Sequence, residues 1–148
     1  MNIKSFLSED QKEAVHAAIR EAELQTSGEI RVHLENRCKE EVLDRAVFIF
    51  RRLDMQATEG KNGVLFYIAV KDRKFSILGD VGINGKVPDH FWNQIKDEMT
   101  EYFKREQFAE GIVSAVKVAG EQLKLYFPHQ ANDKNELSDD ISYGGEED

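Results

Sequence analysis

The chain contains three stretches whose hydrophobic pattern predicts β-strands. Residues 29–35 (EIRVHLE) alternate strictly between polar and apolar side chains, which is typical of a strand with one buried face. Residues 63–70 (GVLFYIAV) are almost continuously apolar, as expected of a central strand covered on both faces. After four charged residues, positions 75–78 resume the strand pattern, and so short a connection predicts a hairpin.

Apolar residues recur three and four positions apart in four other segments, and each segment predicts an amphipathic helix. Ser8 and Gln11 form the pattern of a capping box, so the first helix is expected to begin after Ser8 and to end near residue 25. The other helices are expected over 39–55, 89–103 and 108–127. The resulting order is α-β-α-β-β-α-α, which predicts an α/β fold.

This order places particular polar residues at one edge of the sheet. The first two strands and their helix form a βαβ unit, which makes those strands parallel, and the hairpin makes the third strand antiparallel. Glu29 begins the first strand, Asn62 precedes the second and Asp80 follows the third. The topology therefore brings Glu29, Asn62 and Asp80 together, and the loop after Asp80 can return Asp89 to the same place.

These four side chains offer only oxygen ligands, a chemistry that suits Ca²⁺ or Mg²⁺ rather than zinc or copper. We therefore expect a divalent cation as cofactor, with Ca²⁺ favoured over Mg²⁺, bound by Asp80, Asp89, Glu29 and Asn62.

Each residue also has a purely structural interpretation. Asp89 can cap the third helix, Asp80 can hold a turn between glycines, and Glu29 can be a solvated strand start. His33 lies among polar residues on the second face of its strand, which favours a solvated position over a catalytic base.

Charge divides the chain into a body and a tail. Of the net charge of −8 over 148 residues, positions 131–148 carry seven acidic residues and one lysine, a net −6, which leaves −2 for the rest. We expect a single domain over residues 1–130 and an acidic, disordered tail over 131–148. The acidic balance argues against nucleic acid and anionic membranes as partners.

The sequence shows neither an apolar run of membrane-spanning length nor a signal-peptide pattern, so a cytoplasmic location without membrane insertion is expected. The single cysteine, Cys38, excludes an internal disulfide and offers no zinc spacing. P-loop, GxSxG and HExxH motifs are missing.

Several short motifs together resemble the TPM domain family over residues 6–128. The motifs are SGEIRV at 27–32, NGVL at 62–65, KDR at 71–73, GDVGI at 79–83 and EGI at 110–112. The resemblance implies a three-layer α/β/α sandwich on a small mixed β-sheet, in a stand-alone bacterial form. It also implies calcium binding by acidic residues at the sheet edge, and a family range that extends from acid phosphatase activity to accessory roles.

Our leading hypothesis is a cation-binding domain with an accessory or regulatory role rather than an enzyme, because carboxylates converge without a nucleophile and base pair. The first alternative is a metal-dependent acid phosphatase, in which Asp80 holds the metal and bound water is activated. The second is a protein-interaction module acting through the acidic tail on an unidentified protein partner.

Overall fold

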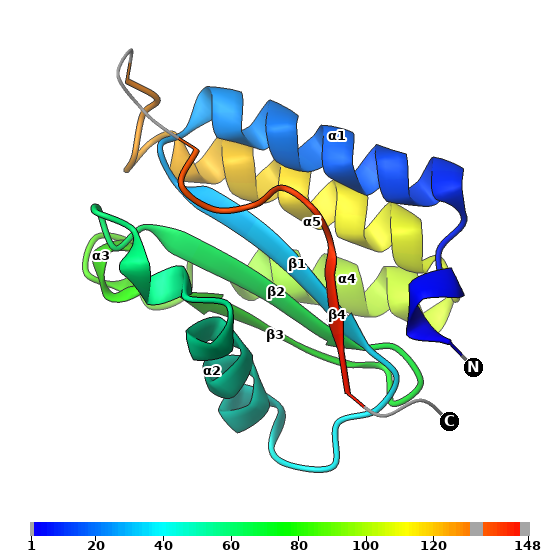
Figure 1. Ribbon diagram of the computed structural model, residues 1–148. Coiled ribbons are helices and arrows are strands. Elements are labelled where there is room, and N and C mark those ends of the chain that lie inside the picture. The colour runs from blue at the N-terminus through cyan, green and yellow to red at the C-terminus, as the bar shows by residue number, and fades with distance from the viewer. Residues whose placement is uncertain (1, 131–134, 146–148) are drawn as a thin grey trace.

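The computed structural model describes residues 2–130 and 135–145, which fold around a mixed four-stranded sheet with the order β3-β2-β1-β4 (Figure 1). The strands are β1 (Glu29–Glu35), β2 (Gly63–Ala69), β3 (Lys74–Gly79) and β4 (Ser142–Gly144). The α-helices are α1 (Glu9–Gln25), α2 (Val42–Arg52), α3 (Val81–Asn84), α4 (Asn93–Lys104) and α5 (Phe108–Leu123). Short 3-10 turns lie at Ile3–Ser5 and Met55–Ala57.

The sheet has the strand directions that the sequence predicts. β1 and β2 are parallel and pair Glu29 with Gly63, whereas β2 and β3 are antiparallel and pair Val64 with Gly79. Two backbone hydrogen bonds close the edge: Glu29 N donates to Asn62 O at 3.0 Å, and Asp80 N donates to Gly63 O at 2.9 Å. The start of β1, the start of β2 and the end of β3 therefore meet, as predicted.

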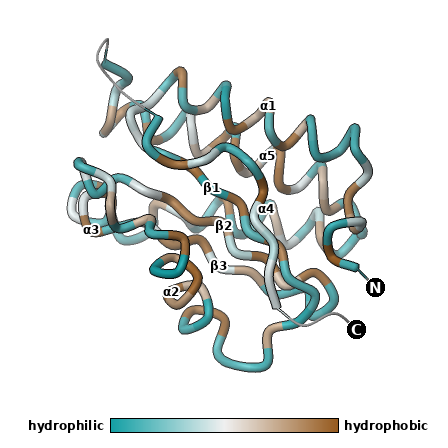
Figure 2. Tube along the Cα trace, viewed as in Figure 1, coloured by the Kyte–Doolittle hydropathy of each residue, from teal (hydrophilic) through white to brown (hydrophobic). Residues whose placement is uncertain are grey.

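Three layers are stacked in the molecule, which confirms the α/β/α sandwich. In Figure 1, α1, α4 and α5 cover one face of the sheet and α2 lies on the other. Hydrophobic residues gather along the strands and on the inner sides of the helices (Figure 2). The larger core includes Val32, Phe66, Ile19 and Ile112, and the smaller core beneath α2 includes Leu65, Tyr67, Ile49 and Phe50.

The helix ends follow their local sequence in one case and depart from it in another. At α1, Gln11 N donates to Ser8 Oγ and Ser8 N to Gln11 Oε1, so the capping box is confirmed. Asp89 does not cap the third long helix, because α4 begins at Asn93 after a turn and has Trp92 as its N-cap. The unexpected short helix α3 takes Asp80 as its N-cap instead.

The acidic tail also differs from expectation. Residues 135–145, here called the strap, run alongside β1 (Figure 1). Their last part forms β4, which pairs with β1 in parallel and places Ser142 opposite His33. Leu137 is only 9% exposed and belongs to the core beneath α2. Composition predicts disorder because it does not show that Leu137 can enter the core or that the free edge of β1 can pair with another strand. These two contacts hold the strap. The rest of the predicted disordered tail lies outside the described residues.

The contact between α1 and α5 depends on a glycine, and this generates a stability prediction. A Cβ added to Gly120 would lie 2.7 Å from Ala22 Cβ and 2.9 Å from Ala22 Cα. Gly120→Ala should therefore push the helices apart and destabilise the fold by about 1–3 kcal/mol. This cost exceeds the stabilisation that the higher helix propensity of alanine provides. Urea unfolding measures this change, with the exposed neighbour Glu121→Ala as the control. An unchanged midpoint in Gly120→Ala would contradict the packing.

Candidate functional site

Asp80 lies where β3 ends and α3 begins, and only one of its carboxylate oxygens is used. Oδ1 accepts a hydrogen bond from Val81 N at 2.7 Å, which caps α3. Oδ2 is buried and has no hydrogen-bond partner among the described residues. A buried anionic oxygen without a donor is costly, so this atom marks a position where a positive group would be stabilised.

The Asn62 side chain presents a second oxygen of this kind. Its Nδ2 donates to Ser27 O at 2.5 Å, and the backbone N of the same residue donates to Thr58 Oγ1 at 3.3 Å, so Asn62 is held by both its side chain and its backbone. Its Oδ1 is buried and has no hydrogen-bond partner within the described part of the chain. Asn62 precedes Gly63, whose carbonyl binds Asp80 N, so the peptide backbones of Asn62 and Asp80 are neighbours.

Two backbone carbonyls of the 58–62 loop lie against the start of α3. A Cβ added to Gly82 would lie 2.5 Å from both Gly60 O and Lys61 O. Glycine is thus required here because the 58–62 loop presses its carbonyl oxygens against the start of α3. Two carbonyl oxygens, one amide oxygen and one carboxylate oxygen come from the same sheet edge.

Glu29 reaches the same edge with its backbone but not with its side chain. Its Oε1 accepts hydrogen bonds from Glu136 N at 2.5 Å and Leu137 N at 2.8 Å, both in the strap. Burial raises the pKa of the Glu29 carboxyl, although these two amides oppose the shift. Alternation along β1 explains the placement, since Glu29 lies on the face toward α2.

The four residues expected to bind a cation are therefore only partly brought together. Asn62 and Asp80 contribute unpartnered oxygens, Glu29 binds the strap, and Asp89 is exposed in the turn between α3 and α4. Across residues 2–130 and 135–145, no three His, Cys, Asp or Glu side chains are grouped as a metal site.

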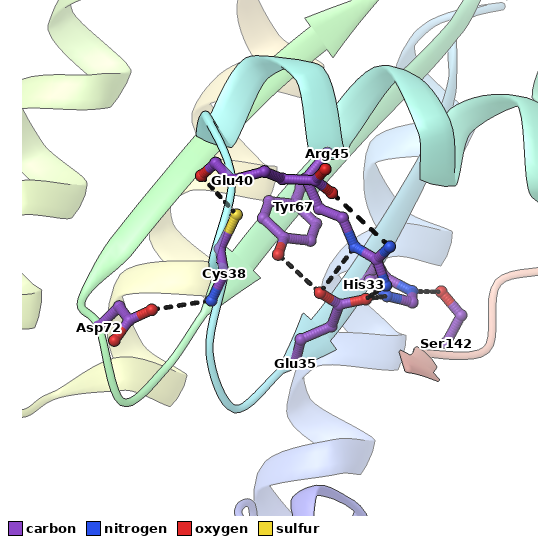
Figure 3. A network of polar contacts seen from close by, with 8 residues as sticks. All are labelled: His33, Glu35, Cys38, Glu40, Arg45, Tyr67, Asp72 and Ser142. Carbon is purple, nitrogen blue, oxygen red and sulfur yellow. Dashed lines mark hydrogen bonds and ion pairs between the residues drawn. The ribbon is translucent and has the colours of Figure 1, made fainter. Parts of the chain in front are cut away.

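A second polar cluster, absent from the sequence expectations, is buried under α2 (Figure 3). The Glu35 carboxylate accepts from Tyr67 Oη at 2.7 Å and from Arg45 Nη2 at 2.7 Å and Nε at 3.1 Å. His33 Nε2 lies 3.0 Å from Glu35 Oε1, and His33 Nδ1 lies 2.7 Å from Ser142 Oγ. His33 and Glu35 are 2% and 1% exposed, so the prediction of a solvated strand face is wrong.

Electrostatics in this cluster are dominated by Glu35. Burial alone would raise its pKa, but hydrogen bonds from His33, Arg45 and Tyr67 lower it to about 2. Burial and the hydrogen bond to Glu35 in turn raise the pKa of Tyr67. The carboxylate is thus kept ionised by three donors, which makes the cluster a neutralised polar core.

The hydroxyl, imidazole and carboxylate of Ser142, His33 and Glu35 follow the order found in nucleophilic hydrolases. Two observations favour a structural role instead. Glu35 is already neutralised by Arg45, and the adjoining cavity of about 310 Å³ is lined by Glu35, Arg45 and Gly145 rather than by Ser142. We assign this cluster to holding α2 and the strap on the sheet.

One signal in the sequence could have revealed the cluster. The apolar run of β2 requires cover on both faces, and its parallel neighbour β1 shares that cover, so the polar face of β1 also lies beneath α2. Polar residues buried in this way need partners from the covering elements, and Arg45 on α2 supplies one.

Comparison with known proteins identifies the family. The family model for the TPM domain, designated a TPM phosphatase model, matches residues 2–122. The chain belongs to the TPM domain family. Among solved structures, this TPM domain is similar to the BA42 protein of the psychrophilic bacterium Bizionia argentinensis, with 44% identity and a TM-score of 0.91. The match covers 97% of this chain and 99% of BA42.

More distant structures share the fold of this TPM domain. The N-terminal domain of a P. gingivalis protein has a TM-score of 0.70 at 22% identity, covering 86% of this chain and 84% of that one. The N-terminal domain of cg2496 from Corynebacterium glutamicum has a TM-score of 0.64 at 11% identity, covering 97% and 84%. No curated protein matches the chain. Within the described residues, no helix has the length and apolar character needed to cross a membrane.

The pKa of Glu35 generates a prediction about acid stability. A carboxyl with a pKa of about 2 in the folded state, against 4.5 ordinarily, stabilises the fold above pH 4.5, and this contribution is lost as pH falls toward 2. Glu35→Gln should lower stability at pH 7 by on the order of 2 kcal/mol, because Arg45 then keeps only the more distant Glu40, at 3.8 Å, as a counter-charge. The substitution should also reduce the difference in the free energy of unfolding between pH 7 and pH 3.

Urea unfolding at both pH values measures these effects. Glu41→Gln, an exposed change in the N-cap residue of α2, is the matched control and should keep the wild-type pH dependence. Equal pH dependence in Glu35→Gln and wild type would contradict the assignment of a strongly lowered pKa to Glu35.

Proposed function

We propose that this TPM domain binds a divalent cation, with Ca²⁺ preferred over Mg²⁺, between the 58–62 loop and the start of α3. Its role is accessory or regulatory rather than catalytic. The observation that carries the proposal is the pair of buried oxygens without partners, Asn62 Oδ1 and Asp80 Oδ2. A hard cation is a partner that both kinds of oxygen accept.

The surrounding atoms support a calcium ion in particular. The carbonyl oxygens of Gly60 and Lys61 lie against Gly82, two residues after Asp80. Ca²⁺ accepts mixed carbonyl, amide and carboxylate oxygens in irregular geometry, whereas Mg²⁺ demands a near-ideal octahedron. With a single carboxylate among the ligands, a dissociation constant on the order of 10⁻⁴–10⁻³ M is expected.

In this proposal the ligand set is narrower than the sequence predicts. Asn62 and Asp80 are the side-chain ligands, and Glu29 contributes through its backbone, since its N–H fixes the carbonyl of Asn62 at 3.0 Å. Asp89, exposed in the turn between α3 and α4, is not among the ligands in this proposal.

The phosphatase alternative finds less support from the same geometry. Phosphoryl transfer needs cationic side chains around the transferred group. Lys61 precedes Asn62 and Lys86 follows Asp80 by six residues, but Lys61 Nζ donates to Gln56 O at 2.5 Å and Lys86 Nζ lies over the Phe127 ring, 4.9 Å from its centre. Both ammonium groups therefore already have other partners.

Substitution of Asp80 tests the proposal. Asp80→Asn retains the shape and the cap of α3 but removes the charge, so the affinity for Ca²⁺ should fall at least about tenfold. A Ca²⁺ titration followed by amide NMR shifts gives both the affinity and the location, and shifts should concentrate in 58–62 and 80–84.

Asp97→Asn, an exposed carboxylate change on α4, is the matched control and should bind as wild type does. Gly82→Ala is a second variant, because its methyl group would displace the carbonyls of Gly60 and Lys61 and weaken binding without changing charge. Binding that is absent at millimolar Ca²⁺, or that survives both Asp80→Asn and Gly82→Ala, would refute the site.

A further inference from the structure

The strap contacts the 58–62 loop directly, and this loop supplies most of the proposed cation ligands. The carboxylate of Glu136 accepts a hydrogen bond from Glu59 N, which lies 3.2 Å from Oε2 and 3.4 Å from Oε1. Leu137 Cδ1 would lie 3.6 Å from a Cβ added at Gly63, the residue that follows the loop. Two successive residues of the strap therefore contact the loop and the residue after it.

The buried contacts of Leu137 involve both ends of the segment that contains the loop. Met55 precedes the loop and is completely buried, in the same core as Leu137. A Cβ added at Gly63 would lie 3.4 Å from Met55 O and 3.5 Å from Met55 Cε. The segment 55–63 thus begins and ends in a core that one side chain of the strap helps to fill.

Glu29 joins the strap to the loop from the other side. Its Oε1 accepts hydrogen bonds from Glu136 N at 2.5 Å and Leu137 N at 2.8 Å, while its own backbone N donates to Asn62 O at 3.0 Å. One residue therefore binds the strap with its side chain and the loop with its backbone. A displaced strap would leave the Glu29 carboxylate without these donors at the point where β1 fixes Asn62.

The loop needs support from outside because its internal contacts are weak. Lys61 N lies 3.3 Å from Thr58 O, and Asn62 N lies 3.3 Å from Thr58 Oγ1, and both distances exceed the usual value of about 2.9–3.0 Å. Lys61 also has a φ of 50°, in the left-handed region that is unfavourable for a residue with a Cβ. Such a conformation persists only where the surrounding structure holds it.

We propose that Glu136 and Leu137 are positioning residues of the cation site, which hold the 58–62 loop in the conformation that binds the ion. The inference rests on the proposed cation site and adds its regulation. Neither residue is a ligand in this proposal. Cation affinity then depends on the docking of Glu136 and Leu137, and by thermodynamic reciprocity a bound cation strengthens that docking.

The C-terminal half of the strap is held by other contacts. β4 pairs with β1, and Ile141 and Tyr143 pack against the larger core rather than the core beneath α2. Release of Glu136 and Leu137 is therefore a local opening that leaves β4 on the sheet. The coupling is confined to the part of the strap that lies next to the loop.

Leu137→Ala tests the positioning role without a change of charge. The truncation removes the contact with Gly63, so the affinity for Ca²⁺, measured by a titration followed by amide NMR shifts, should fall at least about fivefold. Val42→Ala truncates an apolar residue against the same core at the start of α2, and this matched control should bind as wild type does. Wild-type affinity in Leu137→Ala, or an equal loss in both variants, would overturn the proposal.

A pair of Glu136 variants separates the hydrogen bond from the charge and keeps the proposal testable if Leu137→Ala fails to fold. Glu136→Gln and Glu136→Ala both lose the carboxylate charge, but the glutamine oxygen can still accept from Glu59 N. Ca²⁺ should bind Glu136→Ala about twofold to tenfold more weakly than Glu136→Gln, the range that one net hydrogen bond provides. Equal affinities of the two variants would overturn the role of Glu136.

Hydrogen exchange without calcium distinguishes failure of this proposal from failure of the cation site. The Asn62 amide donates to Thr58 Oγ1, so its protection reports the loop conformation. In Ca²⁺-free Leu137→Ala this protection should fall at least about fivefold relative to wild type and to Val42→Ala. Unchanged Asn62 protection alongside wild-type Ca²⁺ binding would overturn only this proposal. A wild type that binds no Ca²⁺ would refute the cation site and the positioning role with it.

Discussion

The whole architecture depends on the complete enclosure of β1. The strand is paired on both edges, by β2 and β4, and covered on both faces, by the α1, α4 and α5 layer and by α2. Yet every second residue of it is polar. Enclosure of a polar strand is stable only if each buried polar group has a partner, and this requirement determines where α2 and the strap lie.

The two ends of β1 meet that requirement in different ways. At its C-terminal end, Arg45 neutralises the Glu35 carboxylate and Tyr67 donates a hydrogen bond to it. Ser142 of the strap contacts His33 there. At its N-terminal end, backbone amides of the strap bind Glu29. The strap thus binds the polar side chains at both ends of β1, whereas Arg31 Nε between them is buried without a hydrogen-bond partner among the described residues. Removal of the strap would leave Glu29 and His33 without these partners.

The sheet edge at which β1 and β2 begin explains why the proposed cation site lies close to β1 but does not include the Glu29 carboxylate. Gly63 pairs with Glu29 on one side, and its carbonyl accepts from Asp80 N on the other, so the three chain segments are joined through one peptide. Alternation then directs Glu29 toward α2, while Asp80 caps α3. Asn62 and Asp80 retain the oxygens that no protein donor satisfies.

The sequence predicts the fold well because its signals are local. The capping box at Ser8, the apolar run of β2 and the short charged turn before β3 each determine one element, and the crossover rule fixes their directions. The proximity of Asn62 and Asp80 follows from that topology. The docking of the strap depends on contacts across more than 100 residues, such as Ser142 with His33, which periodicity does not encode.

A crystal structure of the wild-type protein grown with millimolar Ca²⁺ tests the central claim most directly. The account predicts a calcium ion at about 2.3–2.6 Å from Asp80 Oδ2 and Asn62 Oδ1, with a carbonyl of the 58–62 loop completing the protein ligands. A calcium ion bound elsewhere on the molecule, with Asn62 Oδ1 and Asp80 Oδ2 contacting only water, would contradict it.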